Sequence, residues 1–183
     1  MGAMPPATAA AVPNPAAASG KLLAGMAMTV LTVSDRSSRG ERANATGPLM
    51  VAAFEELGAA VEAVVVADQQ AEISQALRAA IAGGARAIVT TGGTGVGPRD
   101  VTPEATASVI VQDLPGIPEL LRSRDAAANS RVALSRGRAG VTAGPQRTLV
   151  INLAGSVSAV TSALQVLPGI ISHACSQIDG GDH

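Results

Sequence analysis

Four short apolar runs alternate with helical patterns along the chain, and this alternation constrains the fold more than any other feature of the sequence. The runs cover residues 28–33, 61–66, 85–90 and 148–153. Each run is too hydrophobic to leave one face in water, so we expect parallel strands that are covered on both faces. The order of runs and helices predicts an α/β fold: a three-layer open, mostly parallel sheet with helices on both faces, in a single domain.

Helical spacing, with apolar residues three or four positions apart, recurs in three stretches of the sequence. The first stretch ends at Gly58 and the second ends at the glycine pair 83–84. The third runs from Val157 to Ile171 and contains Pro168. Because proline removes a backbone donor, we expect it to kink or interrupt this helix.

Composition excludes several classes of function. Phe54 is the single aromatic residue, so stacking on nucleic-acid bases is nearly excluded. A net charge of −1 gives no reason to expect nucleic acid or an anionic membrane as a partner. No uninterrupted apolar run reaches the ~18–20 residues of a membrane span. Cys175 is the single cysteine, and its place in an apolar helical pattern predicts a buried structural thiol in a cytoplasmic protein.

The first 23 residues differ in composition from the rest of the chain. They are rich in Ala and Pro and lack the basic segment and compact apolar stretch of a signal peptide. Such a sequence buries little surface, so we expect residues 1–23 to be a disordered leader. Residues 24–180 then form the folded domain, which suits the usual length of one domain.

Polar or glycine-rich segments directly follow the four predicted strands. In open parallel sheets, ligands bind outside the carboxyl ends of the strands. We therefore expect these segments to form one pocket at one edge of the sheet. They cover residues 34–36, 68–70, 92–100 and 152–156.

The segment 90–105, with the sequence TTGGTGVGPRDVTPEA, has four glycines within six positions. Glycine allows positive φ and a close approach of the backbone to a ligand, and consecutive amides can then bind an anion. The loop lacks the lysine of a P-loop, and Pro98 stands where a dinucleotide-binding fingerprint needs glycine. Thr102, Pro103 and Glu104 suit the N-cap and first turn of a following helix.

Asp100 lies between this loop and the predicted helix. A carboxylate beside a phosphate site repels the ligand unless a divalent cation bridges the two, and Mg²⁺ is the usual ion. An aspartate in this place can equally cap a turn. The residues alone leave both roles open.

The same loop resembles the TGGTG…RD.TPEA signature of the Mog/MoaB family of molybdenum cofactor biosynthesis proteins. Other segments are similar to that family in the same order and spacing over residues 26–178: SDRSSRG at 34–40, TGP at 46–48, LSR at 134–136, GV at 140–141 and NLAGS at 152–156. The resemblance implies a molybdopterin adenylyltransferase. Such an enzyme transfers AMP from Mg-ATP to the phosphate of molybdopterin and releases pyrophosphate.

The resemblance also implies roles for individual residues. Asp68 and Asp100 match the two acidic positions tied to catalysis, and they would hold Mg²⁺ through phosphate. Ser135, Arg136 and Glu104 match family segments and are further candidates. For Asp35 the alternative role is a turn-capping acid, and for Arg36 a solvated cation. The residues expected to bind substrate or phosphate are Ser34, Asp35, Arg36, Gly92, Gly93, Thr94, Gly95, Asn152, Gly155 and Ser156.

One departure from the family pattern leaves an alternative function open. Ala154 and Val157 stand where the family usually has proline, which should loosen this loop and alter the fit of the pterin. The alternative is a non-catalytic MoaB-like paralogue that binds a pterin or a regulatory protein partner. The presence of both Asp68 and Asp100 favours the enzyme. Family members form trimers, so the resemblance further implies a homotrimer, with other molybdenum cofactor biosynthesis proteins as partners.

Overall fold

The structure is a computed structural model that describes residues 21–41 and 43–181. Six strands form one sheet in the order β2-β1-β3-β6-β5-β4. β1 pairs in parallel with β2 and β3, and β3 pairs in parallel with β6, whereas β5 runs antiparallel to both its neighbours. The predicted mostly parallel sheet is confirmed. The strands are β1 (Ala27–Val33), β2 (Ala60–Val66), β3 (Ala87–Thr91), β4 (Ile110–Asp113), β5 (Ala139–Thr142) and β6 (Leu149–Leu153).

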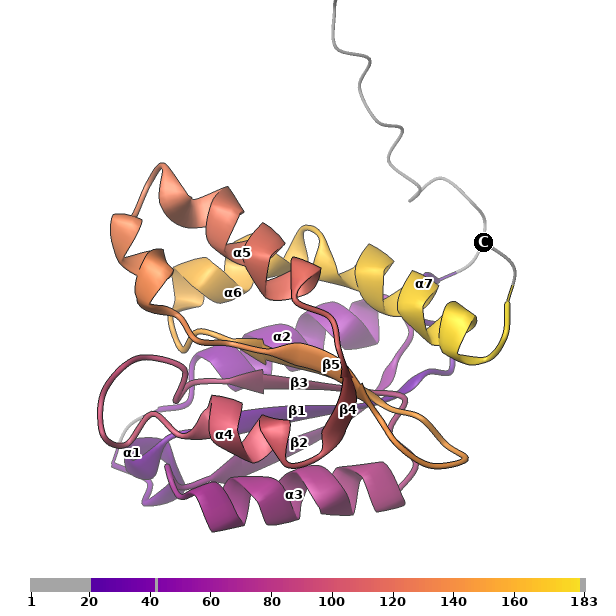
Figure 1. The fold of residues 1–183 in the computed structure, drawn as a ribbon, viewed down its shortest axis with the longest axis horizontal. Coiled ribbons are helices and arrows are strands. Elements are labelled where there is room, and N and C mark those ends of the chain that lie inside the picture. Colours follow the sequence, from indigo (N-terminus) through magenta and orange to yellow (C-terminus); the bar gives the residue numbers. More distant parts are fainter. Residues whose placement is uncertain (1–20, 42, 182–183) are drawn as a thin grey trace, which may run out of the picture.

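Helices cover both faces of the sheet and make three layers (Figure 1). The helices α3 and α4 pack on one face, and α2, α5, α6 and α7 pack on the other. The helices are α1 (Asp35–Ser38), α2 (Thr46–Glu56), α3 (Gln70–Ala82), α4 (Thr102–Ala107), α5 (Gly116–Ala126), α6 (Val157–Leu164) and α7 (Leu167–Ile178), with a 3-10 helix, η2 (Ser130–Leu134).

Successive residues of the central strands enter two separate cores. From β1, Met28 and Val30 join the core beneath α2, α6 and α7, whereas Leu31 and Val33 join the core beneath α3 and α4. Every residue of β3 and β6 is buried. The expectation that strands are covered on both faces is therefore confirmed for β1, β3 and β6.

The strand β2 departs from that expectation. It is parallel, as predicted, but none of its residues is buried, and Val65 is 41% exposed. The physical reason is its place at the border of the sheet, where it pairs with β1 on one side. The helices α2 and α3 contact β2 from opposite faces without closing over it.

The elements β4, α5 and β5, between Ile110 and Thr142, are not predicted by the apolar pattern. The strands β4 and β5 have four residues each and pair antiparallel with one another. The helix α5 buries Pro118 alone among its residues, and its Ile117 and Leu121 are partly buried against the core. The third strand begins at Ala87, two residues later than the sequence predicts.

The predicted break at Pro168 is confirmed. The helix α6 ends at Leu164, and α7 begins at Leu167 with Pro168 in its first turn, at an angle of 57°. Within the described residues, no single helix is long and apolar enough to cross a membrane, and this bent pair reaches that length and composition only when both helices are taken together. Val160 and Ile171 of the pair are buried in the core.

The boundary predicted for the leader needs correction. Residues 1–20 lie outside the described part of the chain, but Leu23 is 1% exposed, and its amide donates to the carbonyl of Leu57 at 2.9 Å. The ordered domain therefore begins before residue 24, because Leu23 fills the core beside α2. Cys175 is a buried free thiol, as predicted, and burial raises the pKa of this thiol.

Candidate functional site

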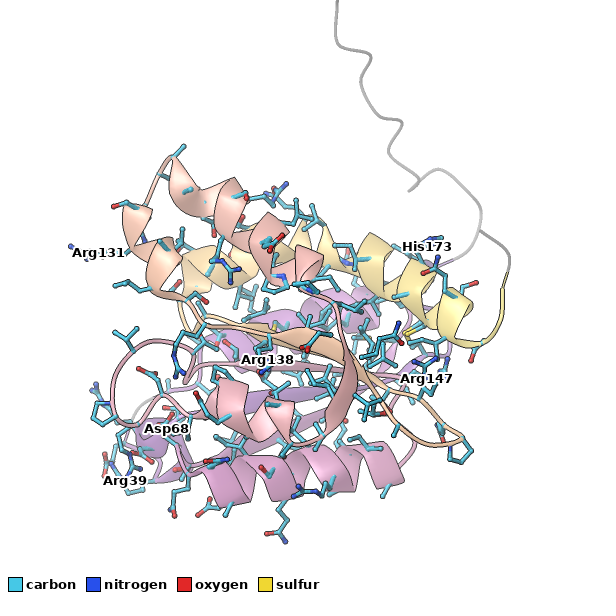
Figure 2. The ribbon with its side chains drawn as sticks, viewed as in Figure 1. Arg39, Asp68, Arg131, Arg138, Arg147 and His173 are labelled. Atoms are coloured by element: carbon cyan, nitrogen blue, oxygen red, sulfur yellow. The ribbon has the colours of Figure 1, made fainter. Side chains whose placement is uncertain are left out.

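The loops that follow β1, β2, β3 and β6 meet at one edge of the sheet, on the left in Figure 1. The amide of Ser34 donates to the carbonyl of Val66 at 2.9 Å, and the amide of Gly92 donates to that of Leu153 at 3.1 Å. These two bonds tie the loops together in pairs. Figure 2 shows Asp68 at this edge and His173 at the opposite end of the molecule. The predicted convergence of the four segments is therefore confirmed.

The chain turns sharply as it leaves β3. Gly92 and Gly93 have φ angles of 101° and 62°, in the region that side chains disfavour. A Cβ on Gly92 would lie 2.3 Å from the carbonyl oxygen of Val33, and one on Gly93 would lie 2.4 Å from the hydroxyl oxygen of Thr102. Both positions require glycine, and the turn thereby packs against the end of β1.

The carbonyl groups of residues 92–95 all accept hydrogen bonds from the protein itself. Thr102 donates to the first two, through its hydroxyl at 2.9 Å and its amide at 3.0 Å. Arg136 donates to the last two, through its amide at 2.8 Å and its Nε at 2.7 Å. Within the described residues, the amides of residues 93–95 donate to no acceptor. The loop thus keeps three consecutive N–H groups free, which is an arrangement that binds anions.

Asp35 and Asp68 hold each other through their backbones. The amide of Asp35 donates to Oδ2 of Asp68 at 2.7 Å, and the amide of Asp68 donates to Oδ1 of Asp35 at 3.0 Å. Arg99 forms an ion pair with the other oxygen of Asp35. Both carboxylate oxygens of Asp35 are therefore engaged, whereas Oδ1 of Asp68 accepts no hydrogen bond from any described residue.

The two carboxylates differ in their affinity for protons. The amide of Asp68 and the guanidinium of Arg99 hold the pKa of Asp35 below its usual value. Burial raises the pKa of Asp68, and the negative charges of Asp35 and Asp100 raise it further, while hydrogen bonding to Asp35 and the charge of Arg99 oppose the rise. The site thus concentrates negative charge, which a bound cation would relieve.

Asp100 caps a turn, which is one of the two roles that the sequence left open for this residue. Its Oδ2 accepts a hydrogen bond from the amide of Gly97 at 2.8 Å, and its own amide donates to the Gly97 carbonyl at 3.0 Å. Its second oxygen accepts no hydrogen bond within the part of the chain that the structure describes. The turn-capping role and a ligand-binding role are therefore compatible.

Two hollows open on either side of the glycine turn. The first, of about 380 Å³, lies between residues 92–95 and the 3-10 helix η2. The second, of about 340 Å³, lies between the end of β1 and the start of α2. Gly92, Gly155 and Ser156 line both hollows and form the wall between them. Thr94, Asp100 and Ser135 line the first hollow, and Ser34 lines the second.

Other candidates from the sequence serve to shape the site. The amide group of Asn152 is buried and donates to the hydroxyls of Thr90 and Thr106, at 3.0 and 2.8 Å. Glu104 pairs with Arg136. Arg36 is exposed on α1 and is not among the residues that line either hollow.

The helices α4 and α6, which follow the two loops, differ in how they are capped. Val101, not Thr102, is the N-cap of α4, because the hydroxyl of Thr102 donates to the Gly92 carbonyl instead of accepting from a helix amide. Ser156 caps α6 by accepting from the amide of Ala159 at 3.2 Å. The hydroxyl of Thr91 donates to the carbonyl of Ala154 at 3.2 Å and so tethers this loop. The effect of the missing prolines on its looseness stays a prediction.

Sequence reasoning missed two arginines at this edge. Arg99 lies next to Asp100 in the glycine-rich segment and pairs with Asp35. Its position in that segment is the sequence signal that could have identified it. Arg131 lines the first hollow from η2 and is labelled in Figure 2 on the same side of the molecule as Asp68. No local pattern distinguishes Arg131 from the other arginines of the chain.

Comparison with known proteins gives a consistent result. Residues 29–173 match the model of a protein family described as a probable molybdopterin binding domain. The chain is 40% identical over 162 residues to a molybdenum cofactor biosynthesis bifunctional protein of Synechococcus elongatus, which covers 88% of this chain and 50% of that protein. It is 36% identical over 146 residues to a molybdopterin adenylyltransferase of Pyrococcus furiosus, at 79% and 86% coverage. The chain thus spans about half the length of the first relative and most of the second.

Solved structures share the fold. A molybdopterin biosynthesis protein from Mycobacterium abscessus superposes with a TM-score of 0.78 at 38% identity, over 85% of this chain and 97% of that one. The tungsten cofactor synthesizing protein MoaB from Pyrococcus furiosus superposes with a TM-score of 0.78 at 32% identity, over 84% and 96%.

Proposed function

Because the chain belongs to the family of the probable molybdopterin binding domain, we propose that it is a molybdopterin adenylyltransferase. It transfers AMP from Mg-ATP to the phosphate of molybdopterin and releases pyrophosphate. The relative that bears this name in Pyrococcus furiosus is matched over 86% of its length. The observation that carries the proposal is the loop 92–95: its carbonyls are paired, its amides at 93–95 donate to no described acceptor, and it lies beside Asp68 and Asp100.

The reaction needs positioning more than covalent help. An oxygen of the molybdopterin phosphate attacks the α-phosphorus of ATP, the bond from that phosphorus to the bridging oxygen breaks, and pyrophosphate leaves with the bond's electron pair. Positioning and charge stabilisation dominate such transfers. The free amides at 93–95 would orient a phosphate, and ligands in the two hollows would lie next to each other because Gly92, Gly155 and Ser156 line both. The attacking oxygen is already anionic, so no histidine base is required.

The acidic residues fit a magnesium ion. Asp68 and Asp100 each use one carboxylate oxygen within the protein, and the other accepts no hydrogen bond from a described residue. Among the described residues, no three His, Cys, Asp or Glu side chains converge on one point. Mg²⁺ typically takes one or two carboxylates together with phosphate oxygens and water, so Asp68 and Asp100 would hold it with the substrate. Bound there, the ion would offset the charge of the reacting phosphates.

We expect ATP binding to depend on this ion. In calorimetric titrations, ATP with Mg²⁺ should bind at least about tenfold more tightly than ATP with a chelator, a difference of ~1.4 kcal/mol. The physical reason is that two carboxylates repel an unaccompanied polyphosphate. Equal affinities in the two titrations would remove the metal-binding role of Asp68 and Asp100.

A single incubation tests the function itself. The protein is mixed with Mg-ATP and molybdopterin, and adenylylated molybdopterin and pyrophosphate are measured. An enzyme forms both in equal amounts and with many turnovers per chain. Pterin binding without either product would instead support the non-catalytic binding protein.

We also expect the protein to form a homotrimer. Large apolar side chains are exposed on the outermost strands, with Val65 on β2 at 41% and Val111 on β4 at 69%. Association would cover such surface. Sedimentation equilibrium at micromolar concentration should give three times the 18.0 kDa chain mass, and a monomer would contradict the trimer. Other molybdenum cofactor biosynthesis proteins are further partners under this proposal.

A further inference from the structure

We propose that Arg136 is a positioning residue, which holds the glycine loop in the conformation that leaves the amides of residues 93–95 free and keeps Asp100 beside them. This inference rests on the proposed function for its catalytic consequence, but not for its effect on the loop. Arg136 does not need to touch the substrate in this role. It acts through the backbone atoms that it binds.

The contacts of Arg136 reach the loop at three points. Its amide donates to the carbonyl of Thr94 at 2.8 Å, and its Nε donates to the carbonyl of Gly95 at 2.7 Å. A terminal guanidinium nitrogen donates to the carbonyl of Asp100. Each carbonyl that Arg136 binds is turned toward the protein, so Arg136 anchors both ends of residues 94–100.

Glu104 completes the arrangement from the first turn of α4. Its carboxylate accepts hydrogen bonds from the guanidinium of Arg136. This bonding is the main reason that the pKa of Glu104 lies below its usual value. The pair therefore ties the segment after η2 to both the glycine loop and the helix that follows it.

The geometry of guanidinium suits this task. It offers five N–H donors in a fixed plane and has no acceptor, and Arg136 directs them at two carbonyls and one carboxylate. Lysine carries its donors on one nitrogen and cannot span three separated acceptors. The pair with Glu104 is 39% and 44% exposed, so it adds little to the stability of the fold. Loss of Arg136 should therefore disturb the loop rather than unfold the protein.

The same segment also lines the first hollow. Leu134 and Ser135, which directly precede Arg136, are among the lining residues. A ligand that contacts Leu134 or Ser135 therefore contacts the segment that leads into Arg136, which holds the loop with the proposed phosphate-binding amides. Arg136 thus links the two sides of the hollow.

Arg138 provides a matched control for the experiment. It is 39% exposed, as Arg136 is, and it pairs with an exposed carboxylate, that of Asp113. Its guanidinium donates to Asp113 and not to the glycine loop. Arg136→Ala and Arg138→Ala therefore remove the same group from similar surroundings, and they differ in the loop contacts.

The first measurement needs no substrate. Amide hydrogen exchange is followed for Gly97, Asp100 and Thr102, whose N–H groups are bonded within the loop. Arg136→Ala should accelerate exchange at these amides, while Arg138→Ala should leave it unchanged and both proteins should melt close to the wild type. Equal exchange in the two variants would overturn the proposal.

The second measurement uses the reaction. Arg136→Ala should lower kcat/KM by between about tenfold and a hundredfold, because small misplacements of substrate are costly, and Arg136→Lys should not restore it. Millimolar guanidinium should recover part of the activity of Arg136→Ala. Full activity in Arg136→Lys would contradict the role of the planar group. A wild-type protein that does not turn over would refute the proposed function, while the exchange result would still decide the positioning role.

Discussion

An Asp100→Asn protein should turn over about 10²–10³-fold more slowly than the wild type, a loss of ~3–4 kcal/mol in transition-state stabilisation. The substitution keeps the size of the side chain and removes its charge. If Asp100 holds Mg²⁺ against the transferring phosphate, its neutral replacement holds the ion more weakly. The negative charge that builds up on the phosphate in the transition state is then less well stabilised. Binding of the pterin should persist or even tighten, because one negative charge near its phosphate is gone.

The fold of this variant should survive. Asp100 accepts one hydrogen bond, from the amide of Gly97 at 2.8 Å, and the side-chain oxygen of asparagine can accept the same bond. The change from a charged to a neutral acceptor costs about 1 kcal/mol at most. The melting temperature and the adenylylation rate, measured on the same preparation, therefore separate the two roles of Asp100.

Asp113→Asn is the matched control. Asp113 is 59% exposed and pairs with Arg138 on the surface, so its loss of charge should leave turnover unchanged. Near-normal turnover in a well-folded Asp100→Asn protein would refute the catalytic assignment. Such a result would leave Asp100 with its turn alone and would favour the non-catalytic binding protein.

A Gly92→Ala protein should lose both stability and activity. The residue has a φ of 101°, and a Cβ there would lie 2.3 Å from the carbonyl oxygen of Val33. Backbone strain of about 1–2 kcal/mol and steric overlap of about 1–3 kcal/mol sum to about 2–5 kcal/mol of lost unfolding free energy. For a chain of this size, the melting temperature should fall by roughly 4–20 °C. Because the turn places the free amides, activity should fall by about a hundredfold or more.

Gly144→Ala separates the two causes of this loss. Gly144 has a φ of 108°, close to that of Gly92, but a Cβ there meets nothing within 4 Å. The control therefore contains the backbone strain without the overlap, and it lies outside both hollows. It should lose about 1–2 kcal/mol and keep its activity. Equal losses of stability in the two variants would show that the contact with Val33 does not constrain the turn.

The sequence predicts the parts of this fold that are buried on both faces. β1, β3 and β6 are recognisable because every side chain on them is apolar or buried by a neighbouring layer. β5 is not recognisable, because its four residues AGVT are small and form a strand by pairing with β4 and β6. The exposed β2 is identified by its apolar sequence, but its exposure depends on its place in the strand order.

For the candidate site, the sequence predicts the location but not the hydrogen bonds. Its location follows from the glycines and from the parallel strands, and the family resemblance adds Asp68 and Arg136. The sequence does not show which atoms of the loop stay free, because the carbonyls of residues 92–95 are paired by Thr102 and Arg136. The two hydrogen bonds between Asp35 and Asp68, each from a backbone amide to a carboxylate, likewise join residues 33 positions apart. Such contacts form only once the sheet has brought the loops together.

Recognition by main-chain amides has a consequence for how this protein could diverge after gene duplication. A substitution other than proline cannot delete an N–H group, so the proposed anion binding depends on the shape of the loop, which Gly92, Thr102 and Arg136 maintain together. The charges of Asp68 and Asp100, in contrast, can each be lost through one substitution. Under the proposed function, a copy could therefore give up catalysis in a single step at either carboxylate and keep its ligand, whereas a substitution that distorts the loop would impair binding and catalysis together. Under the proposed function, proteins that only bind the ligand are thus separated from the enzyme by a substitution at either of two carboxylates.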